Sequence, residues 1–239
     1  MQIAADVHCR LGEQPYWDVI HQRLLWTDIT EGQLYELDPL TGWWQSIYSG
    51  PAVGGFAQQE DGSLLLFRGD DICRRYPDGA LEPLIKIADP GMRRFNDALA
   101  DPEGRVFAGS KSENGSRSAG LFRLGTNGRL EQLFSGTSIA NGMAFSPDLR
   151  VFYWTDSTAR SIHAFDYDRR TGDHSVGREL IVIEPDAGVP DGLTVDSEGC
   201  LWSARWEGSA VHRYSPDGEW MSKTALPVSK VSAATFGGA

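Results

Sequence analysis

The chain has 239 residues, with 27 Gly, 12 Pro and 8 Trp, and no stretch approaches the eighteen apolar residues that a membrane helix needs. Its 22 basic and 33 acidic residues leave a net charge of −11, which repels nucleic-acid phosphates and anionic lipid. We therefore expect neither nucleic acid nor a membrane as a partner. The start MQIAADVHCR has no basic region followed by an apolar run, so the sequence predicts a cytoplasmic protein.

A unit of roughly forty to fifty residues repeats along the chain. Its first half is clearest in residues 54–67, 96–109, 141–154 and 191–204, where an alternating strand, a tight turn and a β-branched or aromatic strand follow one another. A third apolar stretch, a polar turn and a fourth short run complete each unit. Four antiparallel strands repeated around a ring form a β-propeller blade.

The units define the predicted elements in chain order. We place blades at 12–49, 51–87, 92–136, 138–184 and 188–228, and a partial sixth unit at 231–239. The sequence therefore predicts an all-β protein, a single domain over residues 1–239, folded as a six-bladed β-propeller with its last blade incomplete. The polar insertion 110–119 in the third unit is expected to be a surface loop, with a lid over the pocket as the alternative.

Four polar residues share one register of successive units: Glu13, Asn96, Asn141 and Asp191. Glu13 falls in register with Asn141 because Trp26-Thr27-Asp28 then aligns with Trp154-Thr155-Asp156. The first strand of a blade lines the central axis, so these side chains are expected at one mouth of the channel. Each is part of an ordinary turn sequence when taken alone. Their recurrence at the same end of the inner strands favours a functional site.

The residue types at this register indicate a metal site. Glu13, Asn141 and Asp191 would supply two carboxylates and one amide oxygen, with Asn96 as a candidate fourth ligand. Oxygen donors suit a divalent cation such as Ca²⁺, Mg²⁺ or Mn²⁺, and so few ligands leave positions open for water or substrate. Arg94 is expected at the same mouth, where it could hold hydroxyl or carboxylate oxygens; the alternative is a solvated pair with Arg93.

Other catalytic motifs are absent from the sequence. It contains no GxSxG elbow, no Gly-rich phosphate loop, no HExxH and no EF-hand loop. Cys9, Cys73 and Cys200 are isolated and odd in number, which predicts buried small side chains in place of disulfides or a thiolate zinc site.

Several short motifs, taken together, resemble those of the regucalcin/gluconolactonase family of sugar lactonases. They are Leu11-Gly12-Glu13-Gln14-Pro15, Arg94-Phe95-Asn96-Asp97, Ala140-Asn141-Gly142, Phe152-Tyr153-Trp154-Thr155-Asp156, Phe165-Asp166-Tyr167-Asp168, Pro190-Asp191-Gly192 and Phe236-Gly237-Gly238. The resemblance runs along essentially the whole chain.

The resemblance implies a six-bladed propeller with one metal at the channel mouth, held by Glu13, Asn141 and Asp191. It also implies that Arg94 and Asn96 contact sugar hydroxyls, and that the ion is Ca²⁺, Zn²⁺, Mn²⁺ or Fe²⁺. The implied substrate is a small sugar lactone, such as glucono-, xylono- or arabinono-lactone. The chain departs from the family at Gln14, where Gly is usual, and at Ser116, where some members have Glu.

This ligand set suggests metal-dependent hydrolysis of the lactone to an aldonic acid, with Asp191 as the catalytic proton acceptor. Two alternatives remain open. The string YWTD at 153–156 is a signature of extracellular ligand-binding propellers, although that class repeats the string and carries disulfides. The other alternative is a truncated, inactive lactonase homologue, or a different hydrolysis, such as that of phosphotriesters, in the same metal cage.

Overall fold

The computed structural model describes residues 2–238, which form antiparallel sheets and one short 3₁₀ helix, η1 (Pro185–Ala187). The first sheet contains β1 (Gly12–Asp18), β2 (Arg23–Asp28), β3 (Gln33–Asp38) and β4 (Trp43–Ser49); the second β5 (Val53–Gln58), β6 (Leu64–Arg68), β7 (Asp71–Arg75) and β8 (Leu81–Lys86). The third contains β9 (Met92–Ala100), β10 (Val106–Ser112), β11 (Ala119–Leu124) and β12 (Leu130–Thr137). The fourth contains β13 (Ala140–Phe145), β14 (Val151–Asp156), β15 (Ser161–Asp168), β16 (Asp173–His174) and β17 (Arg178–Val182); the fifth β18 (Val189–Val195), β19 (Leu201–Trp206), β20 (Ala210–Tyr214) and β21 (Trp220–Ala225).

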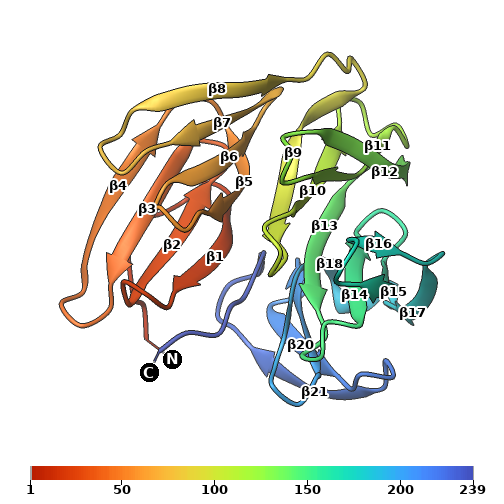
Figure 1. The fold of residues 1–239 in the computed structure, drawn as a ribbon. Helices are drawn as coiled ribbons and strands as arrows, with labels where there is room; N and C mark the ends of the chain where they lie inside the picture. Colours follow the sequence, from red (N-terminus) through yellow and green to blue (C-terminus); the bar gives the residue numbers. More distant parts are fainter. Residues whose placement is uncertain (1, 239) are drawn as a thin grey trace.

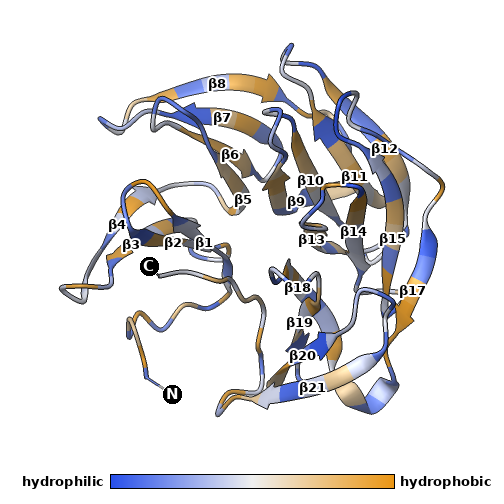
Figure 2. Ribbon diagram, turned by 60° about the horizontal axis from the view of Figure 1, so that its bottom comes forward, coloured by the Kyte–Doolittle hydropathy of each residue, from blue (hydrophilic) through white to orange (hydrophobic). Residues whose placement is uncertain are grey.

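The five sheets are the blades of a β-propeller. Figure 1 shows them following one another along the chain, and Figure 2 shows them arranged around a centre with β1, β5, β9, β13 and β18 innermost. Within residues 2–238, no helix is long and apolar enough to cross a membrane. The all-β propeller class predicted from the sequence is therefore confirmed.

Each blade packs against the next through its own apolar cluster. One cluster joins blades 1 and 2 around Leu25 and Leu66, and another joins blades 2 and 3 around Phe67 and Phe95. The remaining two join blades 3 and 4 through aromatic rings such as Phe107 and join blades 4 and 5 through aliphatic side chains. Large apolar side chains on the buried strands thus hold successive sheets face to face, whereas the outermost strands β8 and β21 are mostly exposed.

The prediction of six blades with an incomplete last one was wrong, because the structure has five. Residues 226–238 join no sheet. Val231 packs on Ala204 and Val211 of blade 5, and Ser232 touches both ends of the ring. Its carbonyl accepts a hydrogen bond from Gly192 N of β18 (2.7 Å), while its hydroxyl donates to Gly12 O of β1 (2.5 Å). This segment links blade 5 to blade 1 by single hydrogen bonds in place of a strand ladder.

Two parts of the predicted boundaries cannot be compared with the structure. Met1 and Ala239, the ends of the predicted domain, lie outside the described residues, and Ala239 is also the last residue of the predicted unit 231–239.

Every inner strand carries an extra residue near its start, and β9 carries a second one at Arg93. The pairing shifts between Glu13 and Tyr16 in β1, Val53 and Gly55 in β5, Asn141 and Met143 in β13, and Pro190 and Leu193 in β18, and Asn96 is skipped in β9. A β-bulge of this kind turns a side chain out of the regular alternation. These bulges therefore redirect side chains at the same end of the channel.

Candidate metal and substrate site

The five residues singled out in the sequence line one cavity at the bulged ends of the inner strands. Glu13, Arg94, Asn96, Asn141 and Asp191 surround a space of about 230 Å³ together with Leu11, Lys111, Ile139, Ser157, Val189 and Trp206. All five are at least nine-tenths buried. The structure thus brings together side chains from blades 1, 3, 4 and 5.

The strand pairing explains how Glu13 and Asn141 come to the same height. Glu13 pairs with Thr27 and Asn141 with Thr155, and Gly12 and Ala140 likewise pair with Asp28 and Asp156. Asp191 lies inside the bulge of β18, next to Pro190, which pairs with Arg205. The register inferred for the first and fourth units is the one that the sheets adopt.

Hydrogen bonds fix the orientation of the Asn141 amide. Its Nδ2 donates to Ser157 Oγ (3.0 Å), and that hydroxyl donates to Pro190 O of the neighbouring blade (2.7 Å). Because the amide nitrogen faces Ser157, the amide oxygen is left for the cavity. Ser157 was not singled out in the sequence, although it directly follows the Trp154-Thr155-Asp156 motif.

Neighbouring groups stabilise the charge of the two carboxylates only in part: Arg94 lowers the pKa of both, and Asn141 and Lys111 also lower that of Asp191. Neither Glu13 nor Asp191 has a basic nitrogen within 4.0 Å among residues 2–238. Burial, with Asp191 and Asp97 nearby, raises the pKa of Glu13 well above its usual range. Burial raises the pKa of Asp191 to about 8, and the charge of Asp97 adds to the effect. A divalent cation would offset this repulsion, so the donor set fits a metal.

Arg94 and Asn96 hold one another beside the carboxylates. Arg94 Nη1 donates to Asn96 Oδ1 (2.6 Å) and to Phe95 O (2.9 Å), and Asn96 Nδ2 donates to Ala140 O of blade 4 (3.0 Å). Burial lowers the pKa of Arg94 to about 10, so the side chain remains charged near neutral pH. Its Nε and Nη2 hydrogens remain for a ligand, whereas the amide of Asn96 already has partners on both atoms.

The two positions that depart from the family have different surroundings. Gln14 adopts a positive φ of 46° and bridges three blades, with Nε2 donating to Phe56 O (2.6 Å) and Ala98 O (2.8 Å) and Oε1 accepting from Phe56 N (2.8 Å). Ser116 lies on the exposed loop 113–118 and does not line the cavity. The predicted surface loop is shorter than 110–119, because β10 extends to Ser112.

A second cavity of about 380 Å³ continues along the channel from Glu13 and Gln14. The remaining parts of the inner strands and Asp97 line this cavity. Burial raises the pKa of Asp97 to about 7. Asp97 follows Asn96 directly, and its charge acts on both Glu13 and Asp191.

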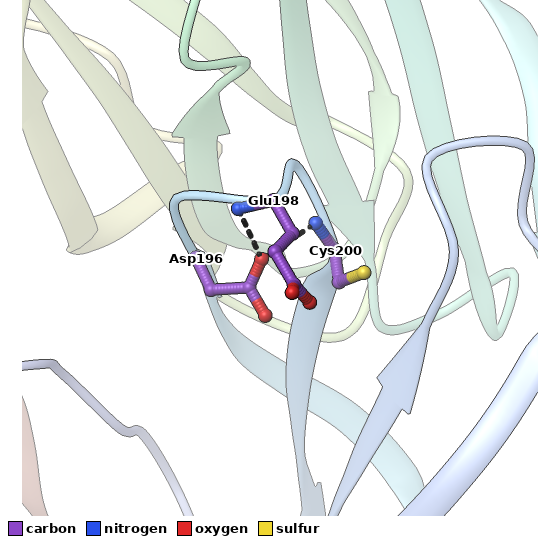
Figure 3. Close-up of side chains that lie close together, drawn as sticks. All are labelled: Asp196, Glu198 and Cys200. Carbon is purple, nitrogen blue, oxygen red and sulfur yellow. Dashed lines mark hydrogen bonds between the residues drawn. The ribbon is translucent and has the colours of Figure 1, made fainter.

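Within residues 2–238, the acidic and thiol side chains whose ligand atoms all lie within 4.8 Å of one another are Asp196, Glu198 and Cys200, in the turn between β18 and β19 (Figure 3). Asp196 accepts hydrogen bonds from Glu198 N (3.0 Å), Cys200 N (2.9 Å), Trp202 Nε1 (2.8 Å) and Arg213 Nη2 (2.7 Å). Asp101 makes the same kind of turn in blade 3, with Arg105 as its partner. Because the Asp196 oxygens already accept these hydrogen bonds, we interpret the cluster of Asp196, Glu198 and Cys200 as a turn stabilised by Arg213.

The sequence matches the profile of one family, the SMP-30/Gluconolactonase/LRE-like region, over residues 11–239. The chain belongs to this family. The SMP-30/gluconolactonase resemblance seen in the motifs is therefore confirmed over nearly the full length of the chain.

Curated relatives in this family span almost the whole chain. The chain is 42% identical to pentonolactonase XacC of Haloferax volcanii over 234 residues, which cover 98% of the chain and 79% of that relative. It is 32% identical to human regucalcin over 240 residues, which cover 97% of the chain and 80% of regucalcin.

Among solved structures, the chain is similar to regucalcin from Agrobacterium tumefaciens, described as a calcium-binding protein. The TM-score is 0.93 at 26% identity, covering 99% of this chain and 81% of that one.

Proposed function

We propose that this protein is a metal-dependent hydrolase that opens sugar lactones to aldonic acids. The observation that carries the proposal is the single cavity in which Glu13, Asn141 and Asp191 present oxygen atoms beside Arg94. The pentonolactonase relative, 42% identical over 98% of the chain, supports a lactone as substrate.

Glu13, Asn141 and Asp191 would hold one divalent cation, and the calcium-binding description of the regucalcin neighbour is consistent with such an ion. When bound, the cation supplies Lewis-acid polarisation of a carbonyl oxygen and a lower pKa for water. Ser157 keeps the Asn141 amide oxygen turned into the cavity. Calcium, zinc, manganese and iron all remain candidates, because carboxylate and amide oxygens bind each of them.

Arg94 and Asn96 would position the sugar. Hydrogen bonds to Asn96 Oδ1 and Phe95 O fix the guanidinium of Arg94. Its remaining N–H groups are therefore held in place beside the cavity. Such preorganised donors suit the hydroxyl and carbonyl oxygens of a lactone ring.

Asp191 would accept the proton in the reaction. Water adds its oxygen to the lactone carbonyl carbon and gives a proton to the Asp191 carboxylate; the acyl–oxygen bond of the ring then breaks, and the proton passes to the departing hydroxyl. The burial of Asp191 in the cavity beside the other proposed ligands and Arg94 suits this role. The product is a hydroxy acid.

The proposal is tested by proton release from glucono-, xylono- and arabinono-1,4- and 1,5-lactones. We expect turnover that a chelator abolishes and that added Mn²⁺, Ca²⁺ or Zn²⁺ restores. Asp191→Asn should lower kcat by about 10²–10⁴-fold, and Glu13→Gln should raise the metal concentration needed for half-maximal activity.

Exposed acidic residues provide matched controls. Glu60→Gln and Asp217→Asn remove the same charges from turns at the surface and should leave the rate unchanged. Wild-type turnover by Asp191→Asn, or full activity in chelator, would refute the proposal.

A further inference from the structure

A third cavity adjoins the proposed reaction cavity and is lined by three cations. It has a volume of about 340 Å³ and its walls are Arg93, Arg94, Lys111, Leu11, Ile29, Thr30, Ala52 and Gly69. Leu11, Arg94 and Lys111 line both cavities. A ligand anchored beside Asp191 can therefore extend between Arg94 and Lys111 into the cavity lined by the three cations.

No side chain that lines this cavity neutralises its positive charges; the acidic groups that act on Arg94 and Lys111 are Glu13 and Asp191 of the proposed metal site. No acidic residue lines it. Among residues 2–238, no carboxylate oxygen lies within 4.0 Å of a side-chain nitrogen of Arg93, Arg94 or Lys111. By contrast, Arg68, Arg105 and Arg213 each pair with an aspartate.

The three cations also act on one another. Burial lowers the pKa of the half-buried Lys111, and the positive charges of Arg94 and Arg93 lower it further. Arg93 likewise lowers the pKa of Arg94. Like charges on one cavity wall are unfavourable where the nearest counter-charges belong to the proposed metal site, and an anionic ligand would relieve them. The cluster is notable on a chain whose net charge of −11 otherwise repels anions.

We propose that the cavity lined by Arg93, Arg94 and Lys111 is an anion subsite that selects lactones carrying a phosphate or carboxylate group on the carbon farthest from the reacting carbonyl. This rests on the proposed lactonase function and narrows its substrate class. Arg94 would contact the ring, whereas Lys111 and Arg93 would contact the distal anion. Lys111 is then a specificity-determining residue supplied by β10.

The test compares the neutral glucono-1,5-lactone with 6-phosphogluconolactone and glucaro-1,4-lactone, using the metal-loaded full chain. We expect KM to be at least about 10-fold lower for an anionic lactone, as one or two charge-assisted hydrogen bonds would produce. Lys111→Met should remove that advantage, because KM should rise at least about 10-fold more for the anionic lactone than for the neutral one, and Lys111→Arg should retain it. Lys223→Met, on the exposed outer strand β21, is the matched control.

A binding measurement separates this inference from the proposed function. Calorimetric titration of 6-phosphogluconate, glucarate and gluconate into the Glu13→Gln variant reports on the subsite without turnover. The subsite is supported if 6-phosphogluconate or glucarate binds more tightly than gluconate and if this difference is lost in Glu13→Gln/Lys111→Met. This result supports the subsite even if every lactone proves inert. Equal binding of all three ligands, or a Lys111→Met effect of the same size on neutral and anionic lactones, overturns it. The phosphate and carboxylate probes show which anion fits.

Discussion

Ser157 orients one of the proposed metal ligands without being a proposed ligand itself. Its hydroxyl receives the Asn141 amide hydrogen and donates to Pro190 O, so it joins β13 to β18 at the point where both contribute to the cavity. Groups that orient a metal ligand in this way matter nearly as much as the ligand.

Ser157→Ala should therefore weaken metal binding by about 10–100-fold, because the Asn141 amide becomes free to turn its nitrogen into the cavity. The measurement is a Mn²⁺ titration followed by calorimetry. Ser175→Ala, in the exposed segment between β16 and β17, serves as the control. Unchanged Mn²⁺ affinity would mean that Asn141 is oriented by something other than Ser157.

The buried carboxyls predict how the metal-free protein responds to pH. The pKa values of Asp97 and Asp191 are raised to about 7 and about 8 from 3.8. The folded state then keeps protons that the unfolded state loses above about pH 4, so the free energy of unfolding falls as pH rises from about 4 to about 8. With chelator present, thermal melting should show a midpoint that decreases over this window.

Asp97→Asn should flatten the decrease, since the amide does not ionise. About 1 kcal/mol corresponds to about 2–4 °C for a chain of this size, so the difference is measurable. Asp217→Asn, in an exposed turn, should keep the wild-type slope. A midpoint that rises between pH 4 and pH 8, or an unchanged slope in Asp97→Asn, would contradict this account.

At the scale of the strands, the bulges bring neighbouring backbones very close together. A Cβ at Gly54 would lie 1.9 Å from Phe95 O, and one at Gly142 would lie 2.2 Å from Leu193 N and 2.6 Å from Asp191 O. Only glycine allows such an approach without displacing a neighbouring blade. The spacing between β13 and β18 thus depends on one missing side chain.

Gly142→Ala should force β13 away from β18, destabilise the protein by about 1–3 kcal/mol and weaken metal binding. Thermal melting and Mn²⁺ titration measure the two effects. Gly69→Ala is the control, because a Cβ there meets nothing within 4 Å, and it should change stability by less than about 0.5 kcal/mol. Equal effects of the two substitutions would refute the close-approach argument.

The strand scale also shows what the sequence could predict. Alternating apolar residues and turn motifs identify four-stranded units, and the repeated Trp-Thr-Asp places Glu13 level with Asn141. The bulges could not be predicted, because one extra residue hardly changes an alternating pattern. Lys111 lies on β10, a second strand, and so escapes a search confined to the inner-strand register.

At the scale of the molecule, the ring has four apolar interfaces between neighbouring blades and one connection of a different kind. Residues 231–239 resemble the start of another repeat, which is why the sequence suggested a sixth blade. In the structure, Val231 packs against apolar side chains of blade 5, and Ser232 forms hydrogen bonds with Gly12 and Gly192. These contacts adjoin Glu13 and Asp191, so the connection between blades 5 and 1 also sets the distance between two proposed ligands.

The central claim is that oxygen atoms from blades 1, 4 and 5 bind one cation at the channel mouth. Crystals soaked in Mn²⁺, with diffraction measured at the manganese absorption edge, test it directly. We predict one strong anomalous peak per chain, contacting Glu13, Asn141 and Asp191. A peak at Asp196, Glu198 and Cys200, or no peak in the cavity at a saturating Mn²⁺ concentration, would contradict the claim.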